Sequence, residues 1–142
     1  MLKMQNKTLK YILLFFIGGY AYCLVEIIYR GYTHISMLIA GGLSFLVIDI
    51  LNETFEYRIS IISKMLISAI AITLIELVAG LIVNKWLNLN VWDYSHQPYN
   101  FMGQICLLFT NIWFLLSFVG ILFSNLLNHL LFGDKRTLGK IF

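Results

Sequence analysis

Charged residues are scarce in this sequence. Asp, Glu, Lys and Arg make up 12% of the 142 residues, against about 25% in a typical soluble domain. Hydrophobic residues make up 60%, against about 45–50%. Both departures argue against a water-soluble globular domain and indicate a protein surrounded mainly by lipid. Since four spans of about 20 residues would use most of this length, we expect no separate catalytic or nucleotide-binding domain.

Cysteine, proline and known catalytic motifs are scarce or missing as well. The two cysteines, Cys23 and Cys106, lie inside apolar runs without a CxxC motif, which argues against a disulfide framework and favours apolar packing. No Walker A loop, nucleophile elbow or zincin motif is present. We therefore expect no cofactor and no metal site. We also expect no cleavable signal peptide, because the first apolar run is too long for one.

Long apolar runs dominate what is present. They predict an all-α integral membrane protein, a single transmembrane domain over residues 1–142 with four transmembrane helices. A short interfacial loop or helix is expected before the fourth helix, because the segment from Asn88 to Pro98 is too polar to span. The predicted spans are about 11–29, 36–51, 61–83 and 104–132.

Basic residues are distributed unevenly between the two sides that four spans would create. One side would hold eight of them: Lys3, Lys7, Lys10, Arg58, Lys64, Lys135, Arg136 and Lys140. The other would hold only Arg30 and Lys85. The positive-inside rule then predicts a multi-pass protein of the cell membrane with both termini in the cytoplasm. With a net charge of only +3 and basic residues at membrane borders, no nucleic-acid partner is expected.

Two glutamates lie inside predicted spans, where a carboxylate is costly unless it is paired or hydrated. Glu26 and Arg30 are four residues apart and can pair on one helix face. They form either a neutralised pair at the membrane border or part of a polar cavity. Glu76 has no basic residue at i±3 or i±4, so it must be protonated, paired across helices or in a wet cavity. Arg30 is the nearest candidate partner, which would join Glu26, Glu76 and Arg30 in one cluster.

Asp49 lies at the far end of the second predicted span. The simplest interpretation is a helix-end acid at the cytoplasmic border, beside Arg58 and Lys64.

The segment before the fourth span concentrates groups that can donate, accept and carry charge. Its histidine, aspartate, amide and tyrosine side chains suit acid–base work or hydrogen bonding. We expect Asp93 or Asn100 to cap the start of the fourth helix. The candidate substrate- or ion-binding residues are Glu26, Arg30, His34, Glu76, Asp93, Tyr94, Asn100 and Gln104; no catalytic residue is assigned.

The motif in this segment resembles the motif of a known protein family. The runs Val91–Ser95, Pro98–Asn100 and Gly103–Leu107, followed by Trp113, resemble the ABC-transporter type IV, or CmpB-like, family, which typically reads W-D-Y-S, P-x-N, G-x-[IV]-C-L and then a tryptophan. Glu26 followed by residues 30–34 is similar to the first-hairpin pattern of short members. Gln104 departs from the family, where many members carry a basic residue. The resemblance implies a multi-helix membrane protein, and coupling to ATP would need a separate ATPase docking around residues 52–60.

The sequence is compatible with three functions. The first is a transport-related protein, a channel-like or permease component with a polar site facing outward. The second is a membrane enzyme acting on a lipid or cell-envelope substrate, with His34, His96 or Asp93 as acid–base groups. The third is a structural or accessory subunit of a membrane complex. The expected partners are the lipid bilayer and, as further candidates, a second copy in a homodimer and a separate ATPase or other subunit.

Overall fold

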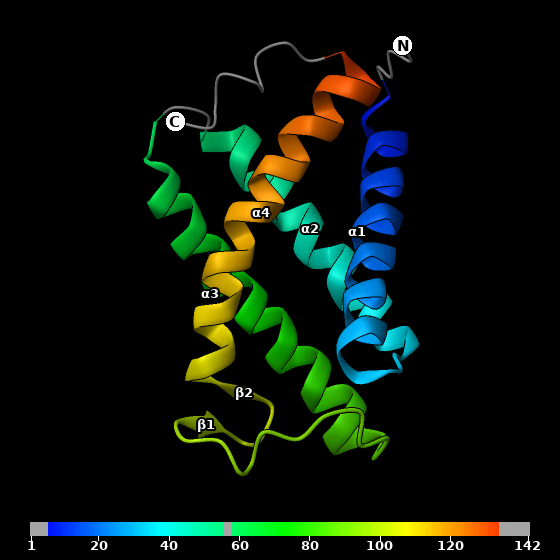
Figure 1. Cartoon of the computed structure of the whole chain (residues 1–142), viewed down its shortest axis with the longest axis vertical. Helices are drawn as coiled ribbons and strands as arrows, with labels where there is room; N and C mark the ends of the chain where they lie inside the picture. The colour runs from blue at the N-terminus through cyan, green and yellow to red at the C-terminus, as the bar shows by residue number, and fades with distance from the viewer. Residues whose placement is uncertain (1–5, 56–57, 134–142) are drawn as a thin grey trace.

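Four long helices form the molecule. The computed structural model describes residues 6–55 and 58–133, and the following elements lie within them (Figure 1). The helices are α1 (Lys7–Arg30), α2 (Ile35–Phe55), α3 (Ile61–Gly80) and α4 (Leu107–Phe132). A π-helical turn (Leu81–Trp86) extends α3, and two short strands, β1 (Asn100–Phe101) and β2 (Ile105–Cys106), precede α4. All four helices are long and apolar enough to cross a membrane, so the predicted all-α, four-span fold is confirmed.

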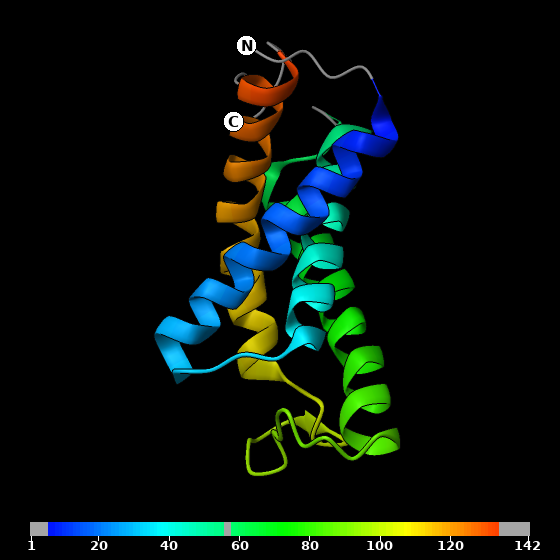
Figure 2. The ribbon, with the colours of Figure 1, turned by 90° about the vertical axis from the view of Figure 1, so that its right-hand side faces the viewer.

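The helices run between two distinct ends of the molecule. The start of α1 and the end of α4 lie together at one end, which we call the terminal end (Figure 2). The β1–β2 pair and the loop that contains it lie at the opposite end, which we call the hairpin end. Of the basic residues that the structure describes, Lys7, Lys10, Arg58 and Lys64 belong to the terminal end, because they lie at the start of α1 or near the α2–α3 connection. Lys3, Lys135, Arg136 and Lys140 lie outside the described residues.

Polar side chains cap the N-termini of α1, α2 and α3. The Asn6 side chain accepts a hydrogen bond from the Thr8 amide at the start of α1, 3.0 Å away, and Ser60 caps α3 through the Ser63 amide. The His34 Nδ1 atom accepts from the Ser36 amide at the start of α2. These caps satisfy donors that the helix itself cannot. They also determine the residue at which each of these helices begins.

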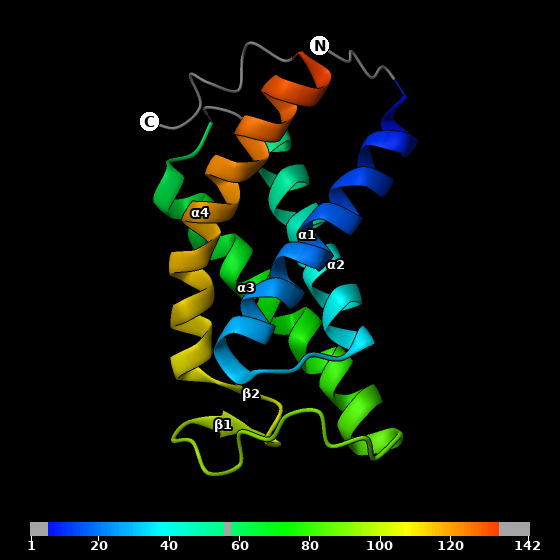
Figure 3. The same ribbon diagram turned by 45° about the vertical axis from the view of Figure 1, so that its right-hand side comes forward.

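Paired glycines let α1 and α2 approach closely. A Cβ added at Gly19 would lie 2.6 Å from the Leu38 carbonyl oxygen, and one at Gly42 would lie 2.6 Å from the Phe15 carbonyl oxygen. Small residues allow this backbone contact in a membrane, where close packing rather than water exclusion holds helices together. The α2 helix then packs against α3 and α4 (Figure 3), so α1 joins the bundle mainly through α2.

The loop between α3 and α4 differs from the predicted boundary. The fourth span was expected to begin at Gln104, but α4 begins at Leu107. Asn100 pairs with Cys106 and Phe101 with Ile105 in an antiparallel ladder. Cys106, with φ −150° and ψ 159°, is therefore extended. Residues 104–106 are part of the loop structure, although Ile105 and Cys106 are apolar like the helix that follows.

Candidate functional site

Glu76 lies near the hairpin end of α3 and accepts hydrogen bonds on both carboxylate oxygens. The Tyr94 hydroxyl donates to Oε2 over 3.1 Å, and the Trp113 indole N–H donates to Oε1 over 3.3 Å. Tyr94 comes from the loop and Trp113 from α4. Glu76 therefore joins three segments of the chain through neutral donors.

Glu26 has a different set of partners. Its Oε2 forms an ion pair of 2.6 Å with Arg30 Nη2, and its Oε1 accepts from the Tyr22 hydroxyl over 3.0 Å. Arg30 also donates from Nη1 to the Val91 carbonyl oxygen over 3.3 Å, and its guanidinium lies 4.7 Å from the centre of the Tyr32 ring. The guanidinium thus links α1 to the loop.

The hypothesis that Arg30 pairs with both glutamates is wrong. Among the described residues, the ion pairs within 4.0 Å include Glu26–Arg30 and none at Glu76. The two acids are instead connected through aromatic side chains, because Tyr22 bonds Glu26 while its ring lies 5.8 Å from that of Trp113. Arg30 lies at the end of α1, and its guanidinium is occupied by Glu26 on the same helix and by the Val91 carbonyl oxygen.

Tyr94 is held in place by a second contact. Its ring stacks on Phe109 of α4 with centroids 4.7 Å apart and planes within 10° of parallel. Burial, followed by the nearby Glu76 carboxylate, raises the pKa of the Tyr94 phenol above its ordinary value. The hydroxyl therefore keeps its proton and remains a donor to Glu76.

Asp93 and Asn100 shape the loop and do not cap α4. Asp93 Oδ1 accepts from the Ser95 amide over 2.8 Å. That backbone hydrogen bond is the main cause that lowers the pKa of Asp93. Asn100 donates to the Gln97 carbonyl oxygen and accepts from the Gly103 amide. Because α4 follows Cys106 and has no side-chain cap, the expected capping role is wrong.

Gln104 and Asn84 connect the loop to the π-helical turn that extends α3. The Asn84 amide donates to Gln104 Oε1 over 2.8 Å, and its own oxygen accepts from the Val91 amide. The Trp92 indole donates to the Gln104 carbonyl oxygen over 3.0 Å. Asn84 was not among the predicted site residues. It lies between the apolar run Leu81–Val83 and Lys85, a position that looks like an ordinary helix end.

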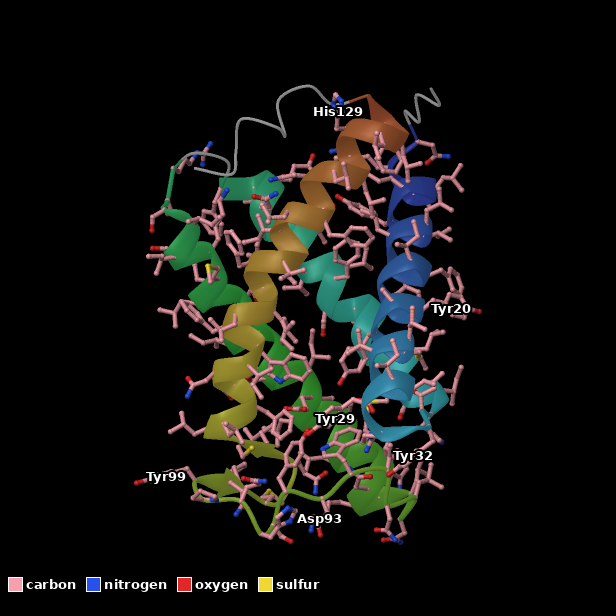
Figure 4. All side chains as sticks on the ribbon, viewed as in Figure 1. Tyr20, Tyr29, Tyr32, Asp93, Tyr99 and His129 are labelled. Carbon is pink, nitrogen blue, oxygen red and sulfur yellow. The ribbon has the colours of Figure 1, made fainter. Side chains whose placement is uncertain are left out.

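Asp93 and Tyr99 lie at the hairpin end, and His129 lies at the opposite end (Figure 4). At the hairpin end, a pocket of about 360 Å³ is bordered by Arg30, Tyr32, Asp93, Tyr94 and His96. We call it the hairpin pocket. A neighbouring pocket of about 460 Å³ contains Asp93, Asn100 and Gln104. His34 stands apart from both, because it caps α2.

A third cavity lies deeper, between the helices. It measures about 140 Å³ and is lined by residues of all four helices, among them Tyr22, Phe45, Glu76 and Trp113. We call it the Glu76 cavity. Within the described part of the chain no group of three or more His, Cys, Asp or Glu residues could hold a metal ion.

A buried polar network at the terminal end was not predicted. Asp49 is 1% exposed and accepts hydrogen bonds from Ser124 at 2.6 Å and Asn128 at 2.7 Å. Its cation is Lys10 of α1, at 3.4 Å, and not Arg58 or Lys64. Lys64 donates to Asn52 over 2.9 Å. The i, i+4 spacing of Ser124 and Asn128 was the signal that could have located this network.

The comparisons with known proteins support one family. The model of the family described as "Putative ABC-transporter type IV" matches residues 3–139. No curated protein matches the chain, and no solved structure does. The family match includes the Trp92–Ser95 motif, the hairpin and all four helices. With these helices and this match over nearly its whole length, the chain belongs to the ABC-transporter type IV family and is a multi-pass, transport-related membrane protein.

Proposed function

We propose that this protein is a transport component in which Glu76 holds an exchangeable proton or monovalent cation, while the hairpin pocket admits the solute. One observation carries the proposal: Glu76 lies within a span, and both its oxygens meet neutral donors, Tyr94 and Trp113. A carboxylate at that depth needs a proton, a cation or water. Because no ion pair within the described residues supplies a fixed cation, the compensating charge can be exchangeable.

Tyr94 supports a coupling between the two sites. It borders the hairpin pocket and also donates to Glu76. A proton or cation arriving at Glu76 competes with this hydrogen bond. A solute that contacts Tyr94 therefore changes the affinity of Glu76 for its cation, and the reverse effect follows by thermodynamic reciprocity.

The test is ion movement in proteoliposomes. The purified protein is reconstituted with an internal pH-sensitive dye, and a K⁺ gradient with valinomycin sets an inside-negative potential. We expect proton uptake above that of protein-free liposomes and its loss in Glu76→Gln, which keeps the size of the side chain. The matched control is Glu53→Gln, a change at a half-exposed acid at the terminal end. Equal uptake by wild type and Glu76→Gln, or by wild type and empty liposomes, refutes the proposal.

We also propose an orientation and partners. The positive-inside rule favours the terminal end in the cytoplasm and the hairpin end outside. A separate ATPase would then dock at the terminal end, near the α2–α3 connection, and a homodimer would widen a thin bundle. Copurification of a second subunit with the tagged chain, and native mass spectrometry of the complex, test both.

The enzyme alternative receives less support. His34 caps α2 through Ser36, and Asp93 is engaged by the Ser95 amide. Of the three acid–base candidates, His96 alone lines the hairpin pocket without such a bond assigned to its side chain among the described residues.

A further inference from the structure

We propose that the Glu76 cavity binds a lipophilic organic monocation, an amine or quaternary ammonium ion about the size of a substituted benzene. This inference rests on the proposed function, because it names the class of cation that exchanges at Glu76.

The size of the cavity sets the first limit. It measures about 140 Å³, and an apolar protein cavity of about 150 Å³ holds benzene. A molecule built on one benzene-sized ring therefore fits. Residues from all four helices line the cavity, so helices rather than the loop would contact the ligand.

The charge of the wall sets the second limit. Glu76 is the only acidic or basic residue among the described residues that line the cavity. Its two hydrogen bonds come from Tyr94 and Trp113, which carry no charge. A single carboxylate without a fixed counter-ion is complementary to one positive charge. An anion would be repelled, and a dication would remain half-compensated.

The remaining wall favours an organic cation over a metal ion. Three aromatic rings line it, from Tyr22, Phe45 and Trp113, together with the apolar side chains of Ile48 and Ile72. Aromatic faces attract ammonium groups. A small inorganic ion would lose its hydration shell and find few oxygen ligands in exchange.

The position of the cavity explains why the ligand should be lipophilic. Its lining residues all lie in the four candidate spans. A molecule that reaches it from the bilayer must itself dissolve in lipid. An ammonium group joined to an aromatic ring meets that requirement, since the ring enters the apolar part and the charge meets Glu76.

The experiment compares two probes of matched size. Benzylammonium and benzyl alcohol have the same number of heavy atoms and differ in charge. Each is titrated by calorimetry into the detergent-solubilised protein at pH 8. We expect saturable binding of benzylammonium at least tenfold tighter than of benzyl alcohol. Affinity should fall as the pH falls, because a proton competes for the same carboxylate.

Two variants identify the groups responsible. Glu76→Gln should abolish the preference for the charged probe and its pH dependence. Phe45→Leu, which keeps an apolar side chain and removes a ring, should weaken benzylammonium binding about 2- to 30-fold and leave benzyl alcohol nearly unchanged. Phe45→Leu also serves as the test if Glu76→Gln does not fold, as judged by circular dichroism.

The outcomes separate this inference from the proposed function. Equal affinity for the two probes, or a charge preference that survives in Glu76→Gln, overturns the organic-cation site. In a parallel liposome assay, Glu76-dependent proton uptake that benzylammonium does not inhibit also overturns the site but leaves the proposed function standing. Uptake that is unaffected by Glu76→Gln refutes the proposed function itself.

Discussion

Tyr94 occupies the point where the loop meets the intramembrane acid. It reaches Glu76 with its hydroxyl and Phe109 with its ring. These two contacts can be separated by mutation, because phenylalanine keeps the stacking surface and removes only the donor.

We expect Tyr94→Phe to fold and to lose about 0.5–1.5 kcal/mol of stability, the net value of one hydrogen bond. Proton uptake in liposomes should change as well, because Glu76 then has one donor instead of two. The matched control is Tyr99→Phe, a change at a loop tyrosine that is 82% exposed. If both variants behave like wild type in uptake, Tyr94 has no part in the exchange.

The hydrogen bond between Asp93 and the Ser95 amide predicts how the loop responds to acid. The Ser95 amide lowers the pKa of Asp93 below its ordinary value of 3.8. A carboxyl group whose pKa is lower in the folded state contributes stability above its unfolded pKa, and this contribution is lost as the pH falls through the folded value.

The loop should therefore keep its structure down to about pH 3.8 and loosen below it. Near-ultraviolet circular dichroism reports this change, since Trp92 is adjacent. Asp93→Asn keeps an acceptor for the Ser95 amide and removes the ionisable group, so it should flatten the acid-side curve. A variant curve that still follows the wild type would assign the transition to another group.

The partners of Glu76 could not have been predicted from spacing along the chain. Tyr94 lies 18 residues away and Trp113 lies 37 away. A helix pattern indicates neighbours at i±3 and i±4, as it did for Glu26 and Arg30. It gives no information on which loop residue folds back over a helix end.

At the scale of the elements, the contact between α1 and α2 depends on glycine. The Cβ of Gly42→Ala would meet a backbone carbonyl oxygen, that of Phe15, which cannot rotate away. We expect this change to cost about 1–3 kcal/mol through overpacking. A thermal melt in detergent measures it.

Gly120→Ala is the control for this prediction. Its new Cβ would meet Ile48 Cδ1, the far end of a flexible side chain. The side chain can shift, and alanine also favours a helix over glycine. A melting temperature for Gly42→Ala at or above that of Gly120→Ala would show that the α1–α2 contact is looser than the structure has it.

The four helices were predictable and the β1–β2 pair was not, for one physical reason. Apolar runs of about 20 residues have few alternatives in lipid, because every backbone group must be satisfied within the segment. Strands of two residues carry no period that could be read from the sequence. For the same reason the apolar residues Ile105 and Cys106 were assigned to the fourth span rather than to the loop.

At the scale of the whole molecule, the two ends contain different polar networks. The terminal end holds Asp49 with Lys10, Ser124 and Asn128, which tie α1, α2 and α4 together. Because Asp49 is almost fully buried, its removal takes one acceptor from both Ser124 and Asn128 and leaves Lys10 paired with Glu53 alone. We expect Asp49→Ala to destabilise the protein by about 1–3 kcal/mol, as measured by urea or thermal unfolding in detergent.

Glu53→Ala is the comparison. Glu53 is the second partner of Lys10, at 3.3 Å, but its side chain is 38% exposed, and exposed pairs contribute about 0–1 kcal/mol. Equal losses in the two variants would mean that Asp49 is hydrated rather than buried.

The distribution of basic residues predicts which end of the molecule faces the cytoplasm. The described residues place Lys7, Lys10, Arg58 and Lys64 at the terminal end, whereas Arg30 and Lys85 lie toward the other. Translocating a loop rich in Lys and Arg is disfavoured, so the terminal end should be cytoplasmic. Single cysteines introduced as Thr8→Cys and Ser95→Cys report the two ends, since both positions are exposed.

The native thiols give little background in this assay, because Cys23 and Cys106 are buried and unpaired. A membrane-impermeant maleimide added to intact cells should label Ser95→Cys and should label Thr8→Cys only after the membrane is opened. The reverse pattern would invert the orientation and place the hairpin pocket in the cytoplasm. Labelling of both positions from outside would contradict an even number of spans, since residues 8 and 95 would then be separated by two or no crossings instead of three.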